Sequence, residues 1–149
     1  MVAGGVSLAM LPAREVKPPP KETLAAPPTQ VAVVDGGTLR LQDQVVLLQG
    51  VQPPSRGTPC AVDQDCGAAA ANALAAMVRE APVACQVTGS DPMGRPFAVC
   101  QASGTELNSA VVAAGWARAE NGVPALKRAE DTARAERRGV WAAGRATDR

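Results

Sequence analysis

The chain contains no histidine and no tyrosine, and its only other aromatic residues are one phenylalanine and two tryptophans. Without histidine it lacks the commonest general base and the usual imidazole ligands of metal ions. Its 15 lysine and arginine residues are balanced by 14 aspartate and glutamate residues, so the net charge is only +1. Proteins that bind nucleic acid strongly usually carry a clear basic excess. Histidine-dependent catalysis is therefore excluded, and a strongly basic groove for nucleic acid is not expected.

An apolar run long enough to cross a membrane is also missing from the N-terminal region. Residues 1–13 hold only the short apolar run 6–11, without the lysine or arginine of a normal signal sequence. We interpret residues 1–13 as a signal or anchor remnant. Residues 14–29 carry proline clusters at 18–20 and 27–28, and we expect them to form a disordered linker.

Four cysteines are present in this small chain. An even number favours two disulfides and an oxidising compartment. The alternatives are a zinc site built from all four thiolates, or free buried thiols. Neither the Cys60 to Cys66 interval nor the Cys85 to Cys100 interval has the C-x2-C spacing of a zinc knuckle. We therefore expect a periplasmic or secreted protein, with tethering to a membrane through the N-terminus as a variant of that interpretation.

Residues 30–143 carry the patterns of one folded domain, followed by a tail at 144–149. Alternating and β-branched residues predict strands, and apolar residues at helical spacing predict helices. The expected strands are 31–34, 38–41, 45–48, 82–88 and 96–102, and the expected helices are 68–79, 106–114 and 125–138. Prolines and a glycine exclude regular structure from a loop at 52–65. This order predicts a mixed α+β fold, a five-stranded Greek-key OB-fold barrel with about three packed helices.

The segment Asp91-Pro92-Met93-Gly94 has the residues of a type I turn between the last two strands. A hairpin folded symmetrically about this turn places Cys85 opposite Cys100, which is close enough for a disulfide. Strict counting puts the pair at a hydrogen-bonded position, so we expect a small bulge nearby. By elimination, Cys60 then pairs with Cys66.

The last expected helix interleaves charges of both signs, which is typical of a solvated helix face. Trp116 and Trp141 follow the ends of expected helices, and we expect both to pack into the core. The charged residues of that helix are Lys127, Arg128, Glu130, Asp131, Arg134, Glu136, Arg137 and Arg138.

Five segments, in the right order over residues 31–143, resemble the staphylococcal nuclease-like family. They are V-V-D-G-G-T-L at 33–39, V-L-L-Q-G-V-Q-P-P-S at 46–55, D-P-M-G-R at 91–95, L-N-S-A-V-V-A-A-G-W-A at 107–117 and A-E-D-T-A-R-A-E-R-R-G-V-W at 129–141. The resemblance implies an OB-fold. It also implies calcium-dependent cleavage of phosphodiesters, with arginines stabilising the negative transition state.

The family's metal-binding carboxylates are missing at both of their positions. The first aspartate of the turn is kept as Asp35, but the metal-binding second one falls on Gly37, and the other metal carboxylate falls on Gln52. A calcium ion needs several hard oxygen ligands, usually including carboxylates. We expect the calcium site to be lost, unless Asp63 and Asp65 supply ligands from the following loop.

The other catalytic positions are also altered, except for one arginine. The family's general-base glutamate falls on Ser55 and its first arginine on Leu47, whereas the second arginine is kept as Arg95. A serine hydroxyl cannot accept a proton from water without a neighbouring base. Arg95 is the one remaining catalytic candidate, with a structural role in the hairpin as the alternative. Phe97 could stack on a base or pack in the core.

These residues favour a catalytically inactive nuclease homologue that acts as a binding or scaffolding module in the cell envelope. Asp35, Arg95 and Phe97 are the candidate ligand-binding residues, with a nucleotide or single-stranded nucleic acid as a weak ligand and an envelope complex as an alternative partner. One alternative function is a residual calcium-dependent nuclease, the only case in which we expect a cofactor. Another is a structural subunit of a membrane-associated envelope complex.

Overall fold

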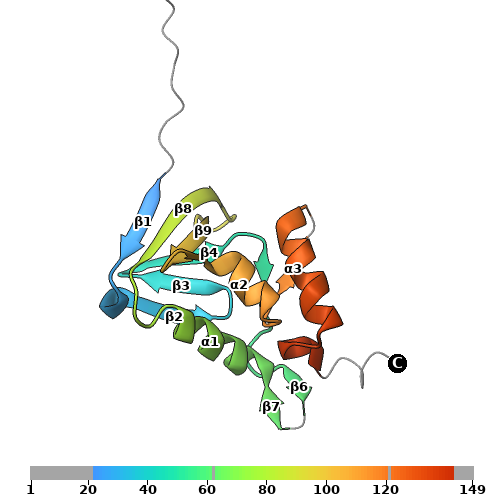
Figure 1. Ribbon diagram of the computed structural model, residues 1–149. Coiled ribbons are helices and arrows are strands. Elements are labelled where there is room, and N and C mark those ends of the chain that lie inside the picture. Colours follow the sequence, from blue (N-terminus) through green and yellow to red (C-terminus); the bar gives the residue numbers. More distant parts are fainter. Residues whose placement is uncertain (1–21, 62, 121, 143–149) are drawn as a thin grey trace, which may run out of the picture.

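The protein is described by a computed structural model covering residues 22–61, 63–120 and 122–142 (Figure 1). The fold is mixed α+β, with three α-helices around a mixed sheet. The helices are α1 (Cys66–Met77), α2 (Leu107–Ala113) and α3 (Pro124–Ala135), with 3-10 turns η1 (Pro28–Gln30) and η2 (Gly139–Ala142). The strands are β1 (Thr23–Ala26), β2 (Val31–Asp35), β3 (Thr38–Leu41), β4 (Gln44–Leu48), β5 (Val51–Gln52), β6 (Pro59–Ala61), β7 (Gln64–Asp65), β8 (Val83–Ser90), β9 (Pro96–Ala102), β10 (Thr105–Glu106) and β11 (Arg118–Ala119). In the described residues no helix has the length and apolar character needed to cross a membrane.

The main sheet follows the order β1-β8-β9-β4-β3-β2, and β10 pairs with β9. Only β4 and β9 run parallel, with Leu47 opposite Phe97, and the other pairs are antiparallel. The two end strands, β1 and β2, are consecutive in the chain, and no ladder joins them within the described ranges. We expected a closed barrel, but the described strands form an open sheet. Residues 27–30 connect its two end strands, β1 and β2.

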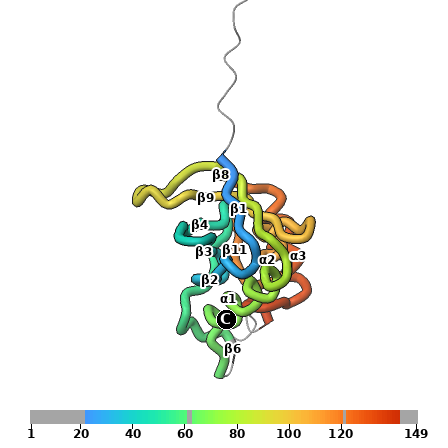
Figure 2. The backbone as a smooth tube through the Cα atoms, turned by 90° about the vertical axis from the view of Figure 1, so that its left-hand side faces the viewer, coloured from blue at the N-terminus to red at the C-terminus, as the bar shows by residue number. Residues whose placement is uncertain are grey.

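The strand β1 corrects our expectation of a linker as far as residue 29. Thr23–Ala26 pairs with β8, and Ala26 is buried against the core. The pairing of β1 with β8 ends before Pro27 and Pro28, because proline has no N–H to donate to a ladder. The next strand, β2, pairs with β3. Both views show β1 beside β8, and Figure 2 shows β2 close to α1. The segments expected as a signal remnant and as the first part of the linker, together with the tail, lie outside the described residues. Residue 143, the last residue of the expected domain, also lies outside them.

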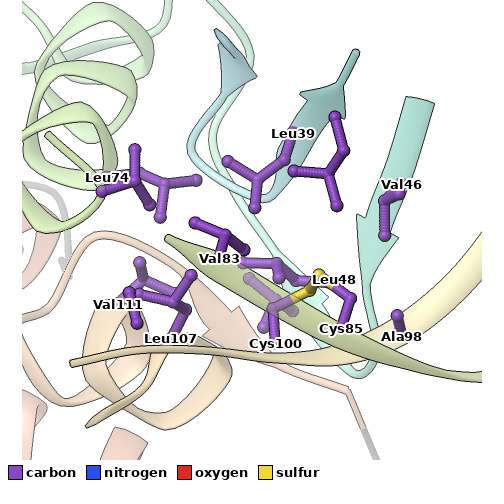
Figure 3. Close-up of a cluster of buried hydrophobic side chains, with 14 of the residues drawn as sticks. Leu39, Val46, Leu48, Leu74, Val83, Cys85, Ala98, Cys100, Leu107 and Val111 are labelled. Atoms are coloured by element: carbon purple, nitrogen blue, oxygen red, sulfur yellow. A yellow bond between two sulfur atoms is a disulfide. The ribbon is translucent and has the colours of Figure 1, made fainter. Parts of the chain in front are cut away.

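The core lies between the inner face of the sheet and helices α1 and α2 (Figure 3). It is made of alanine, valine and leucine, as the scarcity of aromatic residues requires. Cys85 and Cys100 are fully buried in its centre and form a disulfide. The fully buried large apolar residues are Leu39, Val46, Leu48, Leu74, Val83, Leu107, Val111 and Val112.

The hairpin of β8 and β9 forms as the turn residues indicate. The N–H of Gly94 donates to the carbonyl of Asp91 at 2.9 Å, and Cys85 stands opposite Cys100. A register shift follows at residues 87–89. The second disulfide joins Cys60 to Cys66. Two disulfides in a chain of this size are typical of proteins outside the reducing cytoplasm.

Helix boundaries differ from the expected ones by a few residues. Helix α1 begins two residues earlier, at Cys66, because Asp65 caps it. Helix α3 ends at Ala135, and Arg137 adopts a left-handed φ of 55° before Gly139 does the same. The chain after α3 folds back onto the end of α2, since the N–H of Val140 donates to the carbonyl of Gly115 at 2.8 Å. The loop expected at 52–65 contains the short β6–β7 ladder.

Candidate functional site

The first metal position of the family, Gly37, lies buried in the turn between β2 and β3. The carboxylate of Asp35 accepts the N–H of Gly37 at 2.8 Å, so it closes this turn. A Cβ atom at residue 37 would lie 2.9 and 3.0 Å from the Cδ and Cγ atoms of Pro53, and 3.3 Å from Val51. These separations are shorter than van der Waals contact. The space that a carboxylate would need at residue 37 is therefore filled by the ring of Pro53.

The second metal position and the general-base position are exposed. Gln52 lies in β5, opposite Arg118 of β11. Ser55 is exposed as well, and its backbone contacts Gly67 of α1 so closely that a side chain at residue 67 would overlap it. Neither position carries a charged oxygen, so neither offers calcium a carboxylate or water a base.

The loop carboxylates do not replace the missing ligands. Asp65 Oδ1 accepts the N–H of Gly57 at 2.8 Å and that of Ala68 at 3.0 Å. These bonds, the one from Ala68 above all, lower the pKa of Asp65. Asp63 is exposed in a left-handed turn, with φ of 56°. Within the described ranges, no three Asp, Glu, Cys or His side chains gather as a metal site would need. The residues present do not fit a calcium ion.

The retained Arg95 is bound within its own hairpin. Its Nε donates to Asp91 Oδ2 at 2.7 Å, while Asp91 Oδ1 accepts the backbone N–H of Arg95 at 2.8 Å and that of Met93 at 2.9 Å. Burial alone would raise the pKa of Asp91, but these hydrogen bonds outweigh it and the pKa is lowered. Arg95 also lines an open cavity of about 550 Å³ together with Leu24 and Gln44.

The structure does not bring Arg95 and Asp35 to one point. Strand β9 runs parallel to β4, and Phe97 pairs with Leu47. Arg95 comes two residues before Phe97, so it lies near the start of β4. The turn after Asp35 meets the other end of β4, where the N–H of Leu48 donates to the carbonyl of Gly37 at 2.8 Å. Leu47 and Phe97 are half-buried.

A second cavity, of about 370 Å³, lies beside Gln52, and we call it the Arg118 pocket. Its walls include Gln52, Pro54, Thr58, Arg118 and the Cys60–Cys66 disulfide. Gln52 and Pro53 line the Arg118 pocket, so it adjoins the positions that the family resemblance assigns to the metal.

An arginine pair on one indole was not anticipated from the sequence. The guanidinium carbons of Arg118 and Arg134 lie 5.0 and 4.9 Å from the ring centroid of Trp141. Trp141 is half-buried, as is Trp116, so neither belongs to the fully buried core we expected. The Nε1 atom of Trp141 is buried without a hydrogen-bond partner in the part of the chain that the structure describes.

Two buried polar residues were also missed. Asn108 is buried and bonds to Cys100 N at 3.0 Å, Gln49 O at 3.0 Å and Ala98 O at 3.1 Å. Glu130 corrects our interpretation of α3 as simply solvated, because only 5% of it is exposed. The signal for both was their place within the family-like segments.

The side chain of Glu130 holds β11 against α3. Its Oε2 accepts the N–H of Ala119 at 2.8 Å, and its Oε1 accepts Lys127 Nζ at 2.9 Å. Burial by itself would raise the pKa of Glu130, but the bonds from Lys127 and Ala119 prevail and the pKa is lowered.

Comparison with known proteins agrees with this framework. The model of the staphylococcal nuclease homologue family matches residues 45–143. The chain is also similar to a succinoglycan biosynthesis protein, ExoI, of Rhizobium meliloti, with 30% identity over 122 residues. That match covers 76% of this chain and 64% of the relative, so the chain spans less than two thirds of the relative's length. The V-V-D-G-G-T-L segment precedes the matched range, whereas the other four family-like segments fall within it. The chain therefore belongs to the family of staphylococcal nuclease homologues.

Proposed function

We propose that this protein is a non-catalytic member of the nuclease family that serves as a binding module outside the cytoplasm. The observation that carries the proposal is the Pro53 ring in the space where the metal-binding side chain would stand at residue 37. Gln52, Ser55 and Leu47 remove the remaining carboxylate, the base and one arginine. The OB-fold barrel of the family then acts as a scaffold rather than as an enzyme.

The ligand class follows from charge and from the similarity to the relative. A net charge of +1 gives little general attraction to a nucleic acid. The relative is named for succinoglycan biosynthesis, which favours a role around a glycan. The two disulfides support a periplasmic or secreted location.

A nuclease assay tests the loss of catalysis. Purified protein is incubated with denatured DNA and calcium, alongside its Arg95→Ala variant and an active family member as positive control. We expect no hydrolysis above background from either form, and no calcium binding by calorimetry. Hydrolysis that depends on Arg95 would overturn the proposal in favour of a residual calcium-dependent nuclease.

The alternative of a subunit in a membrane-associated complex makes a different prediction. Crosslinking of intact cells would then trap the chain in a defined assembly. A protein that remains monomeric after crosslinking and after extraction in mild detergent supports the free binding module instead.

A further inference from the structure

We infer that the Arg118 pocket binds an acidic sugar unit, meaning a sugar ring that carries a carboxylate or a phosphate. The inference rests on the proposed binding role and names its place and its ligand class. It concerns a pocket next to the altered nuclease positions, and it requires none of the family's catalytic groups.

Arg118 is held in place from two sides. Its backbone pairs with Gln52 in the β5–β11 ladder, and its guanidinium lies over the indole of Trp141. A guanidinium above an aromatic ring keeps its N–H donors, and those donors match the two oxygens of a carboxylate or phosphate. Little side-chain freedom remains to be lost on binding, which favours affinity.

The positive charge of this region is not neutralised within the described residues. Neither Arg118 nor Arg134 forms a salt bridge with a described residue, and no acidic side chain lines the Arg118 pocket. Arg134 helps to lower the pKa of Glu130, but the direct partners of that carboxylate are Lys127 and Ala119. Two guanidinium groups over one indole repel each other, and a bound anion would relieve that repulsion.

Gln52 explains why Arg118 remains available. Residues directly opposite each other in a ladder project from the same face, and both Gln52 and Arg118 line this pocket. A carboxylate at residue 52 would pair with Arg118 and occupy its donors. The amide cannot do so, and it can both donate to and accept from a sugar hydroxyl.

The other walls favour a sugar over a nucleobase. Single-stranded nucleic acid is generally held by aromatic side chains on which the bases stack. No aromatic residue lines this pocket, whereas Pro53, Pro54 and Pro59 offer aliphatic ring faces and Thr58 offers a hydroxyl. A volume of about 370 Å³ is at the small end of ligand pockets, which suits one or two sugar rings.

An NMR titration of the full chain tests the inference. The probes are glucuronate, glucose 6-phosphate and neutral glucose. The chain has two tryptophans. The indole N–H signal of Trp141 reports on Arg118, which lies over that ring, and the signal of Trp116 serves as an internal reference. We expect saturable shifts with one or both acidic sugars, which identifies the anion, and none with glucose.

Three variants locate the site. Arg118→Gln should weaken binding by about tenfold or more, because a charged hydrogen-bonding pair is lost. Arg128→Gln removes the same charge from an exposed position of α3 outside the pocket and should bind as the wild type does. Gln52→Glu should weaken binding as Arg118→Gln does, since the new carboxylate pairs with Arg118.

Equal affinities of Arg118→Gln and Arg128→Gln, or no saturable shift with either acidic sugar, would overturn the inference. Tighter Arg118-dependent binding of a nucleoside bisphosphate would overturn the assignment to a sugar. If Arg118→Gln fails to fold, the affinity of Gln52→Glu for the acidic sugars tests the inference instead, and an affinity equal to that of the wild type would overturn it. The nuclease assay fails or succeeds separately, since it depends on Arg95 rather than on Arg118.

Discussion

At residue 37 the side chain is a single hydrogen atom, and the Pro53 ring lies against it. The two residues form one packed unit because Pro53 Cδ and Cγ occupy the space into which any Cβ at residue 37 would project. In the proposed non-catalytic protein, the missing metal ligand at residue 37 is therefore a matter of volume as well as of charge. This distinguishes Gly37 from Gln52, whose side chain is exposed.

Gly37→Ala should destabilise the fold by about 1–3 kcal/mol, the usual cost of overpacking. Thermal or denaturant unfolding measures the change. Gly89→Ala is the matched control, because a Cβ at residue 89 meets nothing within 4 Å. In a Pro53→Ala background the cost of Gly37→Ala should shrink, and an unchanged cost would contradict the contact.

Glu130 should make stability depend on pH in the acidic range. Its pKa is lowered in the folded protein from the ordinary value of 4.5, so its charged form stabilises the fold above that value. This contribution is lost as the pH falls below about 4.5 and the carboxylate takes up a proton. Unfolding free energies measured from pH 7 to pH 3 should decline less in Glu130→Gln than in the wild type.

At pH 7, Glu130→Gln should itself cost about 1–3 kcal/mol, because a buried hydrogen-bonded charge is removed. The exposed Glu136, which forms an ion pair with Arg138 at 2.7 Å, gives the comparison. Glu136→Gln should change stability by less than about 0.5 kcal/mol. Similar pH profiles for the two variants would refute the buried role of Glu130.

Among the elements, α2 is tied to the sheet through Asn108. Its amide bonds to β9 at two points and to the carbonyl of Gln49, so three backbone groups lose a hydrogen bond in Asn108→Ala. Of these three, the carbonyl of Ala98 still accepts the N–H of Gln49 at 2.8 Å. We expect a loss of about 2–3 kcal/mol in unfolding free energy. Ser109→Ala, one residue along, removes only an exposed bond to Glu106 and should be nearly neutral. A neutral Asn108→Ala would show that water replaces the amide.

The two disulfides should differ in their response to reductant. Cys85 and Cys100 are fully buried, whereas Cys60 is half-exposed in the β6–β7 segment. Access limits thiol–disulfide exchange, so mild reduction under native conditions should open Cys60–Cys66 first. Alkylation followed by peptide mass mapping would show the order, and simultaneous opening of both bonds would contradict it.

The β8–β9 hairpin could be predicted because its information is local. Asp91, Pro92 and Gly94 specify the turn, and the equal distances of Cys85 and Cys100 from it specify the pairing. Strand β1 could not be predicted, because four residues between proline clusters carry no clear alternation and their partner strand is distant in the chain. Whether Glu130 faces water or β11 depends on tertiary packing, and charge spacing along α3 does not reveal it.

For the molecule as a whole, β1 is the segment that completes the sheet. A chain starting at residue 27 should be less stable than one starting at residue 22 by about 2 kcal/mol or more, since Leu24 and Ala26 leave the core and the β8 edge is exposed. Thermal unfolding of the two forms provides the measurement. The chain starting at residue 22 retains every element described above and serves as the reference. Equal stability would show that β1 contributes nothing.

The candidate site was predictable in its chemistry but not in its shape. The residue types at 37, 47, 52 and 55 predict that the metal ligands, the base and one arginine of the family are missing, and the nuclease assay tests this prediction. The sequence does not reveal that Pro53 fills the space beside Gly37, nor that Arg118 stands opposite Gln52 over Trp141. The first depends on how the β2–β3 turn meets the chain around β5, and the second on how β5 and β11 pair. Long-range packing sets both.

The contact between Gly37 and Pro53 also bears on how this chain could change in evolution or in the laboratory. An aspartate at residue 37 would have to appear together with a smaller residue at 53, because alone it lowers stability before any activity exists to be selected. Selection acting on single substitutions would therefore discard it. A library designed to recover a nuclease from this scaffold should vary residues 37 and 53 jointly. In a library that varies residues 37, 47, 52 and 55 but keeps Pro53, the folded members should be those with glycine at residue 37, and these should be inactive.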